Sequence, residues 1–169
     1  MPEAALPSDA VWDDLTFSEQ FLLWAIRMWA QLSDDPVRAH DFIAPAFERV
    51  GVPGAGASFH SFMCGITAAA RRRIEVRCPR ATEICRDERG LLHALHACQR
   101  NRPDAAHVQL AAYVHEDAVR HVMTHASLLM RACLRGGVLL RPAEETALPH
   151  PLAADHDDRV GAPRGVTIH

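Results

Sequence analysis

The chain has 169 residues, of which 49% are hydrophobic, and its formal net charge is −3. This apolar fraction is enough to bury the core of a single domain, and it excludes a chain that is disordered throughout. The charge argues against general nucleic-acid affinity, which needs a clustered positive field. All 18 residues counted as lysine or arginine are arginine, which indicates a GC-rich bacterial genome rather than a function.

The sequence lacks the features of membrane and exported proteins. Its longest apolar stretches, such as 21–26, fall far short of the roughly 20 residues that a membrane-spanning helix needs. The segment 1–14 shows no basic stretch followed by an apolar one, as a signal peptide would. Five cysteines are an odd number, which favours reduced thiols over a disulfide framework. We therefore expect a cytoplasmic protein with no membrane partner.

Two parts of the chain share one sequence pattern. The motif E-x-x-L-L-x-A-I/L at 19–26 recurs at 88–95. The segment that begins at Pro36 recurs at Pro103, and these two segments are slightly closer together along the chain than the two copies of the motif are. Because internal repeats decide the whole fold, this order of matches favours a duplicated unit.

A third and weaker match aligns 71–77 with 135–141, with an offset that is smaller again. Offsets that fall along the chain are what short deletions in connecting loops produce. We predict one copy at 15–79 and a second at 84–142. Chance similarity between helices rich in Ala, Leu and Arg is the alternative explanation.

The first copy is predicted to hold three helices. Thr16 or Ser18 can cap the first helix. Pro36, preceded by two aspartates, marks the start of the second. A glycine-rich loop at 51–56 separates it from a third helix, which we expect from Ser58 to about Arg72.

The second copy is predicted to repeat this plan. An extended connector at 73–79 joins the copies, because apolar and charged residues alternate there. Three helices then follow at about 86–100, 103–115 and 116–135, and an extended segment at 138–140 ends the copy.

The character of the sequence changes after residue 141, where prolines and small or acidic residues show no helical periodicity. We expect 143–169 to form a disordered acidic tail. The predicted fold is all-α: a six-helix bundle of two pseudo-equivalent three-helix repeats with short extended connectors, in a single domain at 1–142.

The first predicted helix is apolar on two sides. Its second apolar side carries Phe21, Trp24 and Met28 at helical spacing. The second copy has small or polar residues at the equivalent positions, Gly90, His93 and Ala97. Either this helix lies centrally, with both sides internal, or the stripe is an interface for homodimerisation or for a partner protein.

Eleven histidines are many for this length, so metal or haem binding must be considered. Asp117, His121 and His125 follow one another one helical turn apart on the last helix, and side chains at this spacing can chelate a divalent ion. The two histidines also sit at the edge of that helix's apolar side, where they would simply cover the core.

Two further groups are candidates for ligand contact. His40 and His107 occupy equivalent places in the two copies and could meet as a symmetric, proton-sensitive site, or each could fix a helix contact. The run Arg71, Arg72 and Arg73 is a possible anion contact, although arginines at the end of a helix need no ligand to explain them.

Catalytic signatures are scarce. The sequence has no nucleophile elbow, no phosphate-binding loop after a strand and no Cys-x-x-Cys motif. We therefore expect a non-catalytic bacterial accessory or regulatory module that acts through protein contact, without a cofactor. The alternative is a sensor or storage protein that binds a metal or haem through its clustered histidines.

Overall fold

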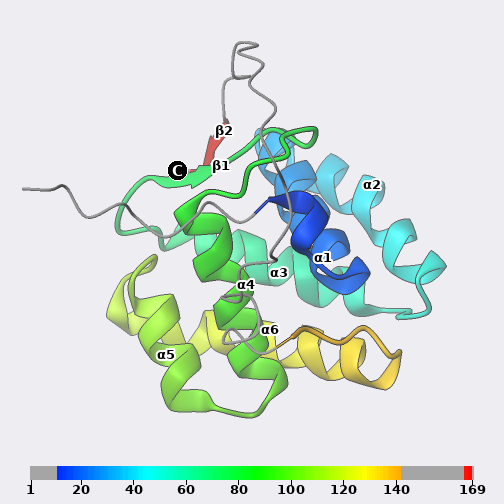
Figure 1. The fold of residues 1–169 in the computed structure, drawn as a ribbon. Helices are drawn as coiled ribbons and strands as arrows, with labels where there is room; N and C mark the ends of the chain where they lie inside the picture. The colour runs from blue at the N-terminus through cyan, green and yellow to red at the C-terminus, as the bar shows by residue number, and fades with distance from the viewer. Residues whose placement is uncertain (1–10, 142–165, 169) are drawn as a thin grey trace, which may run out of the picture.

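The computed structural model describes residues 11–141 and 166–168, and this part of the chain is mostly helical (Figure 1). In chain order its elements are η1 (Trp12–Asp14), α1 (Phe17–Gln31), α2 (Pro36–Arg49), α3 (Ala55–Ala68), β1 (Ile74–Val76), α4 (Arg86–Gln99), α5 (Pro103–Ala111), α6 (Glu116–Arg135) and β2 (Val166–Ile168). The six predicted helices are therefore present. None of the described helices is long and apolar enough to cross a bilayer.

The helices share one hydrophobic core. Helix α4 lies near the middle of Figure 1 and contacts α1, α5 and α6, while α3 packs against α2 and α6. The apolar cluster draws side chains from all six helices. Its largest fully buried hydrophobic side chains include Trp29, Phe47, Phe59 and Phe62.

Local capping explains where the first two helices begin. The Thr16 hydroxyl accepts a hydrogen bond from the backbone N–H of Glu19, and the Glu19 carboxylate accepts one from the backbone N–H of Thr16, at 2.7 Å. This reciprocal arrangement is a capping box. Asp35 caps α2 by accepting from the backbone N–H of Arg38, and Pro36 occupies the first turn, where a missing N–H costs nothing.

Two helices end earlier than their sequence pattern predicts. Helix α3 ends at Ala68 instead of about Arg72, and it also begins earlier than Ser58, directly after Gly54. Gly54 has a φ of 78°, a left-handed conformation that glycine adopts without strain and that cannot continue a helix. Helix α5 ends at Ala111 instead of about His115.

The early ends of α3 and α5 have a common cause. The segments that follow them form an antiparallel bridge between Ala70 and Val114. Two backbone hydrogen bonds of 2.9 Å flank the bridge, one from Arg71 to Tyr113 and one from His115 to Ala69. Because these bonds join segments that lie far apart in the chain, helical periodicity does not reveal them.

The predicted extended connector contains strand β1, which pairs antiparallel with β2. Ile74 lies opposite Ile168 and Val76 opposite Val166. Strand β2 falls within the segment 143–169 that we predicted as a disordered tail, and the sequence pattern does not predict it, because so short a strand gains order only from its partner. The rest of that segment lies outside the described residues.

The segment after α6 is extended, as predicted, and it is held against α4. Val138 and Leu140 are buried while Leu139 between them is exposed, which is the alternation of an extended segment on a core. The Gln99 side chain donates to the carbonyl of Val138 and accepts from the N–H of Leu140, at 2.9 and 2.8 Å.

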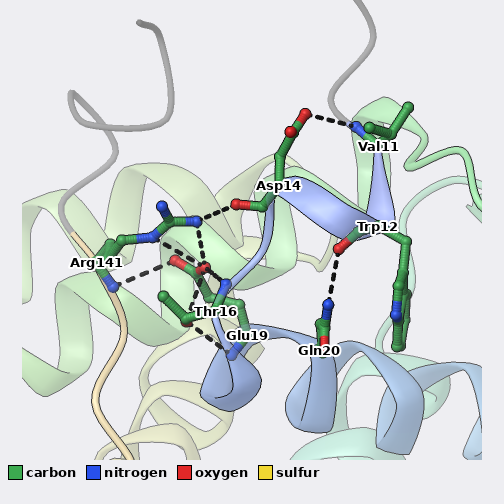
Figure 2. A network of polar contacts seen from close by, with 7 residues as sticks. All are labelled: Val11, Trp12, Asp14, Thr16, Glu19, Gln20 and Arg141. Atoms are coloured by element: carbon green, nitrogen blue, oxygen red, sulfur yellow. Dashed lines mark hydrogen bonds and ion pairs between the residues drawn. The ribbon is translucent and has the colours of Figure 1, made fainter. Parts of the chain in front are cut away.

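Arg141 ties the end of this segment to the start of α1 (Figure 2). Its backbone N–H donates to Glu19 Oε1 at 3.2 Å, and its guanidinium Nη2 donates to Glu19 Oε2 at 3.0 Å and to the carbonyl oxygen of Asp14. In the same network the Gln20 side chain donates to the carbonyl oxygen of Trp12 at 3.0 Å. Glu19 therefore serves both as a helix cap and as the anchor for Arg141.

The Glu19 carboxylate is expected to make the stability of the domain sensitive to acid. Burial by itself raises the pKa of Glu19, but hydrogen bonds from Arg141 and Thr16 outweigh burial, so the pKa is lowered. A lowered folded-state pKa contributes stability above the unfolded-state pKa, and this contribution is lost as the pH falls through the folded-state value. We expect the free energy of unfolding to fall less between about pH 7 and about pH 3 in Glu19→Gln than in the unaltered chain.

Urea denaturation at a series of pH values measures this difference. Glu48→Gln is the control, because Glu48 is exposed and its side chain has no polar partner among the described residues. If Glu19→Gln and Glu48→Gln lose the same free energy on acidification, Glu19 has no special role.

Candidate functional site

The structure divides the predicted stripe on α1 between core and surface. Phe21 is 8% exposed and belongs to the hydrophobic core. Trp24 and Met28 are half-buried and pack against that core from outside. The stripe is thus internal at Phe21 and reaches solvent at Trp24 and Met28.

Aromatic rings continue from Phe21 in several directions. Phe21 stacks on Phe17 and on Trp24, with ring centroids 6.5 and 6.1 Å apart, and it meets Phe47 edge-on at 4.9 Å. The Trp24 ring also lies 6.5 Å from the ring of Phe42 on α2. A continuous row of rings therefore runs from the buried Phe47 to the outside of α1 and α2.

The outer rings of this row are solvent-exposed. Phe17 is 67% exposed and Phe42 is 54% exposed, and Trp24 lies half-buried beside Phe42. We call Phe17, Trp24 and Phe42 the aromatic surface. Trp24 adjoins Phe42 directly, and Phe17 is joined to Trp24 through Phe21. Single exposed apolar residues are ordinary, whereas a group of them on one side of the molecule is a feature of contact sites.

The sequence contained a signal for Phe17 that the predicted stripe left out. Phe17 precedes Phe21 by one helical turn and Trp24 by two, so the three side chains share one side of α1. Phe17 is exposed because it opens the helix, directly after the Thr16 cap. Phe42 carries no such signal, since its position beside Trp24 depends on how α2 packs on α1.

The two equivalent histidines have different neighbours. His40 meets His60 edge-on, with centroids 5.0 Å apart, and His60 Nε2 lies 3.4 Å from the sulfur of Cys64. His107 instead pairs with Glu116 at 2.8 Å on the surface, where the two side chains are 42% and 73% exposed. His40 is thus part of a helix contact between α2 and α3, and His107 joins α5 to α6.

The predicted chelating group on α6 presents two imidazoles. His121 and His125 lie edge to face with centroids 4.7 Å apart, and Asp117 is exposed one turn before them. Across residues 11–141 and 166–168, no three or more His, Cys, Asp or Glu side chains are placed to hold a metal ion. Two neighbouring imidazoles on the solvated edge of a helix do not by themselves indicate a metal site.

The arginine run makes contacts within the protein. Arg71 and Arg72 donate to the carbonyl oxygens of residues 111 and 112, at 3.1 and 3.2 Å, where α5 ends. Such contacts satisfy the free carbonyls at a helix C-terminus and complement its dipole. Arg72 also binds Asp87 through two hydrogen bonds of 2.8 and 2.6 Å, while Arg73 is exposed.

Three comparisons with known proteins bear on this site. No family model matches the chain, and searches of the curated proteins and of the solved structures gave no significant match. The function must therefore be argued from the residues of this chain.

Proposed function

We propose that this chain is a non-catalytic protein-contact module and that its aromatic surface binds a second copy of the chain. The observation that carries the proposal is that Phe17 is 67% exposed and Phe42 is 54% exposed. Both belong to a row of rings whose inner members are buried in the core. Because Phe21 and Phe47 anchor this row from beneath, the outer rings are presented on a rigid base. Rigid aromatic anchors are enriched at the centres of protein interfaces.

A second copy suits this surface because a twofold interface places one patch against itself. Such a patch must be complementary to itself, and an apolar surface satisfies this condition without a matching pattern of charges.

The thiol chemistry of the chain supports a role without catalysis. Cys64 and His60 resemble a nucleophile and its base in their spacing, but burial raises the pKa of Cys64, and burial together with His40 lowers the pKa of His60. Both effects favour the neutral thiol and the neutral imidazole over the reactive thiolate pair. All five cysteines are free.

Replacing both exposed rings by glutamate tests the proposed function. We expect the unaltered chain to sediment as a dimer and Phe17→Glu/Phe42→Glu to dissociate at least roughly 30-fold more readily, since truncating a central anchor costs about 2 kcal/mol. Analytical ultracentrifugation over a range of concentrations measures both masses. Because both rings are exposed, their replacement leaves the core intact.

Val108→Glu is the matched control for this experiment. Val108 is 68% exposed, like Phe17, but it lies on α5, away from the aromatic surface. The control should keep the mass of the unaltered chain. The proposal is wrong if the unaltered chain is monomeric at every concentration, or if Phe17→Glu/Phe42→Glu associates as strongly as the unaltered chain.

We further propose that the domain arose by duplication, as the sequence pattern predicts. Supporting this, the carboxylates of Glu19 and Glu88 each close a capping box at the start of α1 and α4. Each also accepts a hydrogen bond from the backbone of an extended segment: Glu88 from Arg77 at 2.9 Å and Glu19 from Arg141 at 3.2 Å.

These two hydrogen bonds cross between the proposed copies. Arg77 lies near the end of the first copy and donates to Glu88 of the second, whereas Arg141 lies near the end of the second copy and donates to Glu19 of the first. A reciprocal exchange of this kind is what a duplicated unit with approximate twofold symmetry would produce. The proposed copies then differ most on the outer side of α1 and α4, where only the first is aromatic.

A further inference from the structure

A pocket of about 500 Å³ lies between the start of α4 and the end of α5. Its lining contains three arginines, Arg72, Arg86 and Arg89, together with Gly90, His93 and Tyr113. These residues come from three separate segments of the chain, so the pocket is a product of the tertiary fold. None of them belongs to the aromatic surface.

The charges around the pocket do not balance. Asp87, its acidic lining residue, is already engaged by Arg72 through two hydrogen bonds and by the backbone N–H of Glu75 at 2.8 Å. Arg86 and Arg89 have no hydrogen-bond or carboxylate partner among the described residues. Two guanidinium groups therefore border the pocket without a hydrogen-bonded carboxylate from residues 11–141 or 166–168, and the nearby charge of Arg86 only helps to lower the pKa of Asp87.

Tyr113 and Gly90 form a closely fitted wall of the pocket. Tyr113 is only 4% exposed, its hydroxyl donates to the carbonyl oxygen of Asp87 at 3.4 Å, and the Arg72 guanidinium lies over its ring at 5.0 Å. A Cβ atom at position 90 would lie 1.7 Å from the Tyr113 hydroxyl oxygen. Glycine at this position is what lets the tyrosine ring pack against α4.

We infer that this pocket binds a small anion carrying a phosphate or carboxylate group, held by Arg86 and Arg89. Guanidinium groups form paired, charge-assisted hydrogen bonds with both kinds of anion. Arg86 opens α4 and Arg89 follows it by three positions, so both guanidinium groups lie on the same side of the helix. The volume lies within the range of pockets that bind small molecules.

His93 completes the recognition as a neutral group. Burial, and then the charge of Arg89, lower the pKa of His93, so its imidazole is uncharged at neutral pH. A neutral imidazole has one donor and one acceptor nitrogen, and it can bind a hydroxyl or a protonated oxygen of the ligand. The positive charge of the site therefore comes from the arginines.

The proposed duplication gives this pocket a counterpart in the first half. When 88–95 is aligned with 19–26 and Pro103 with Pro36, three residues of the pocket lining, Gly90, His93 and Gln109, correspond to the three aromatic residues Phe21, Trp24 and Phe42. The positions that line the pocket in the second proposed copy are therefore occupied by aromatic residues in the first. The anion site itself rests on the pocket and its charges, and it stands without the duplication.

Titration with inorganic phosphate and with citrate tests the inference. We expect saturable binding, measured by isothermal titration calorimetry at low ionic strength, and binding roughly tenfold weaker or more in Arg86→Gln/Arg89→Gln. A preference for phosphate over citrate, or the reverse, tells which group the site takes. Arg131→Gln/Arg135→Gln, which removes two exposed arginines of α6, should bind as the unaltered chain does.

Nuclear magnetic resonance of the unaltered chain provides a readout that needs no variant. Phosphate or citrate should shift the His93 ring signals and leave those of His121 unchanged. The inference fails if neither anion binds, if the shifts occur elsewhere, or if the double variant keeps full affinity. The Phe17→Glu/Phe42→Glu variant should still bind the anion, so the failure of the dimer proposal and the failure of the anion site are distinguishable.

Discussion

Glu88→Ala is expected to lower the free energy of unfolding by about 3–5 kcal/mol. The Glu88 and Arg27 side chains are both completely buried, and they form a forked ion pair with contacts of 2.7 and 3.1 Å. Removing the carboxylate leaves the Arg27 guanidinium as an uncompensated charge in the interior. Breaking a buried pair from one side is among the most destabilising single changes.

The pair also holds the segment between β1 and α4. Arg27 donates to the carbonyl oxygens of Ala81 and Glu83, at 2.5 and 2.7 Å. Glu88 accepts from the backbone N–H groups of Arg77 and Cys85, both at 2.9 Å. Glu88→Ala therefore leaves two backbone donors without partners as well as the guanidinium.

Urea denaturation followed by circular dichroism measures the loss. Glu75→Ala is the matched control, because Glu75 pairs with Arg77 at 3.4 Å on the surface and its side chain is 56% exposed. An exposed pair of this kind contributes about 0–1 kcal/mol. If Glu88→Ala loses no more than Glu75→Ala, the buried pair does not stabilise the fold.

A second substitution separates the charge from the packing. Arg27→Met/Glu88→Leu removes both charges and should be more stable than Glu88→Ala, because apolar side chains can replace a buried ion pair. Recovery should be partial, since the connector carbonyl oxygens that Arg27 binds lose their donor. A double variant no more stable than Glu88→Ala would show that the connector contacts dominate.

The Arg27–Glu88 pair shows what local sequence patterns can and cannot predict. Thr16 and Pro36 mark helix starts by their own chemistry, so the beginnings of α1 and α2 were predictable. Arg27 is a charged residue within an apolar helix, and its partner lies 61 positions away. No periodicity connects two residues at that separation.

The same limit applies to the candidate site. The pattern showed that α1 is apolar on two sides, and this holds for Phe21 and Trp24. Which of these rings is buried depends on α2, because Phe47 covers Phe21 while Phe42 lies beside Trp24. The division between core and surface is thus a tertiary property, and the sequence could only leave both alternatives open.

Gly56→Val is expected to force α2 and α3 apart and to lower the free energy of unfolding by about 1–3 kcal/mol, the range for overpacking a close contact. A Cβ atom at Gly56 would lie 2.8 Å from both the Cα and the Cβ of Ala44 on α2. Because one of these atoms belongs to the backbone, no change of rotamer relieves the overlap. The helices must separate, and the contacts between Phe47 and Phe59 must loosen with them.

Ala57→Val is the control for placing a valine in the first turn of α3. Ala57 is exposed and adjoins Gly56 on α3, so valine there meets solvent and should cost about 0.7 kcal/mol or less. Urea denaturation compares the two variants directly. Equal stability would mean that α2 does not approach α3 as closely as Gly56 requires. Since α2 also positions Phe42 beside Trp24, a loss confined to Gly56→Val should also weaken the self-association that we propose for the aromatic surface.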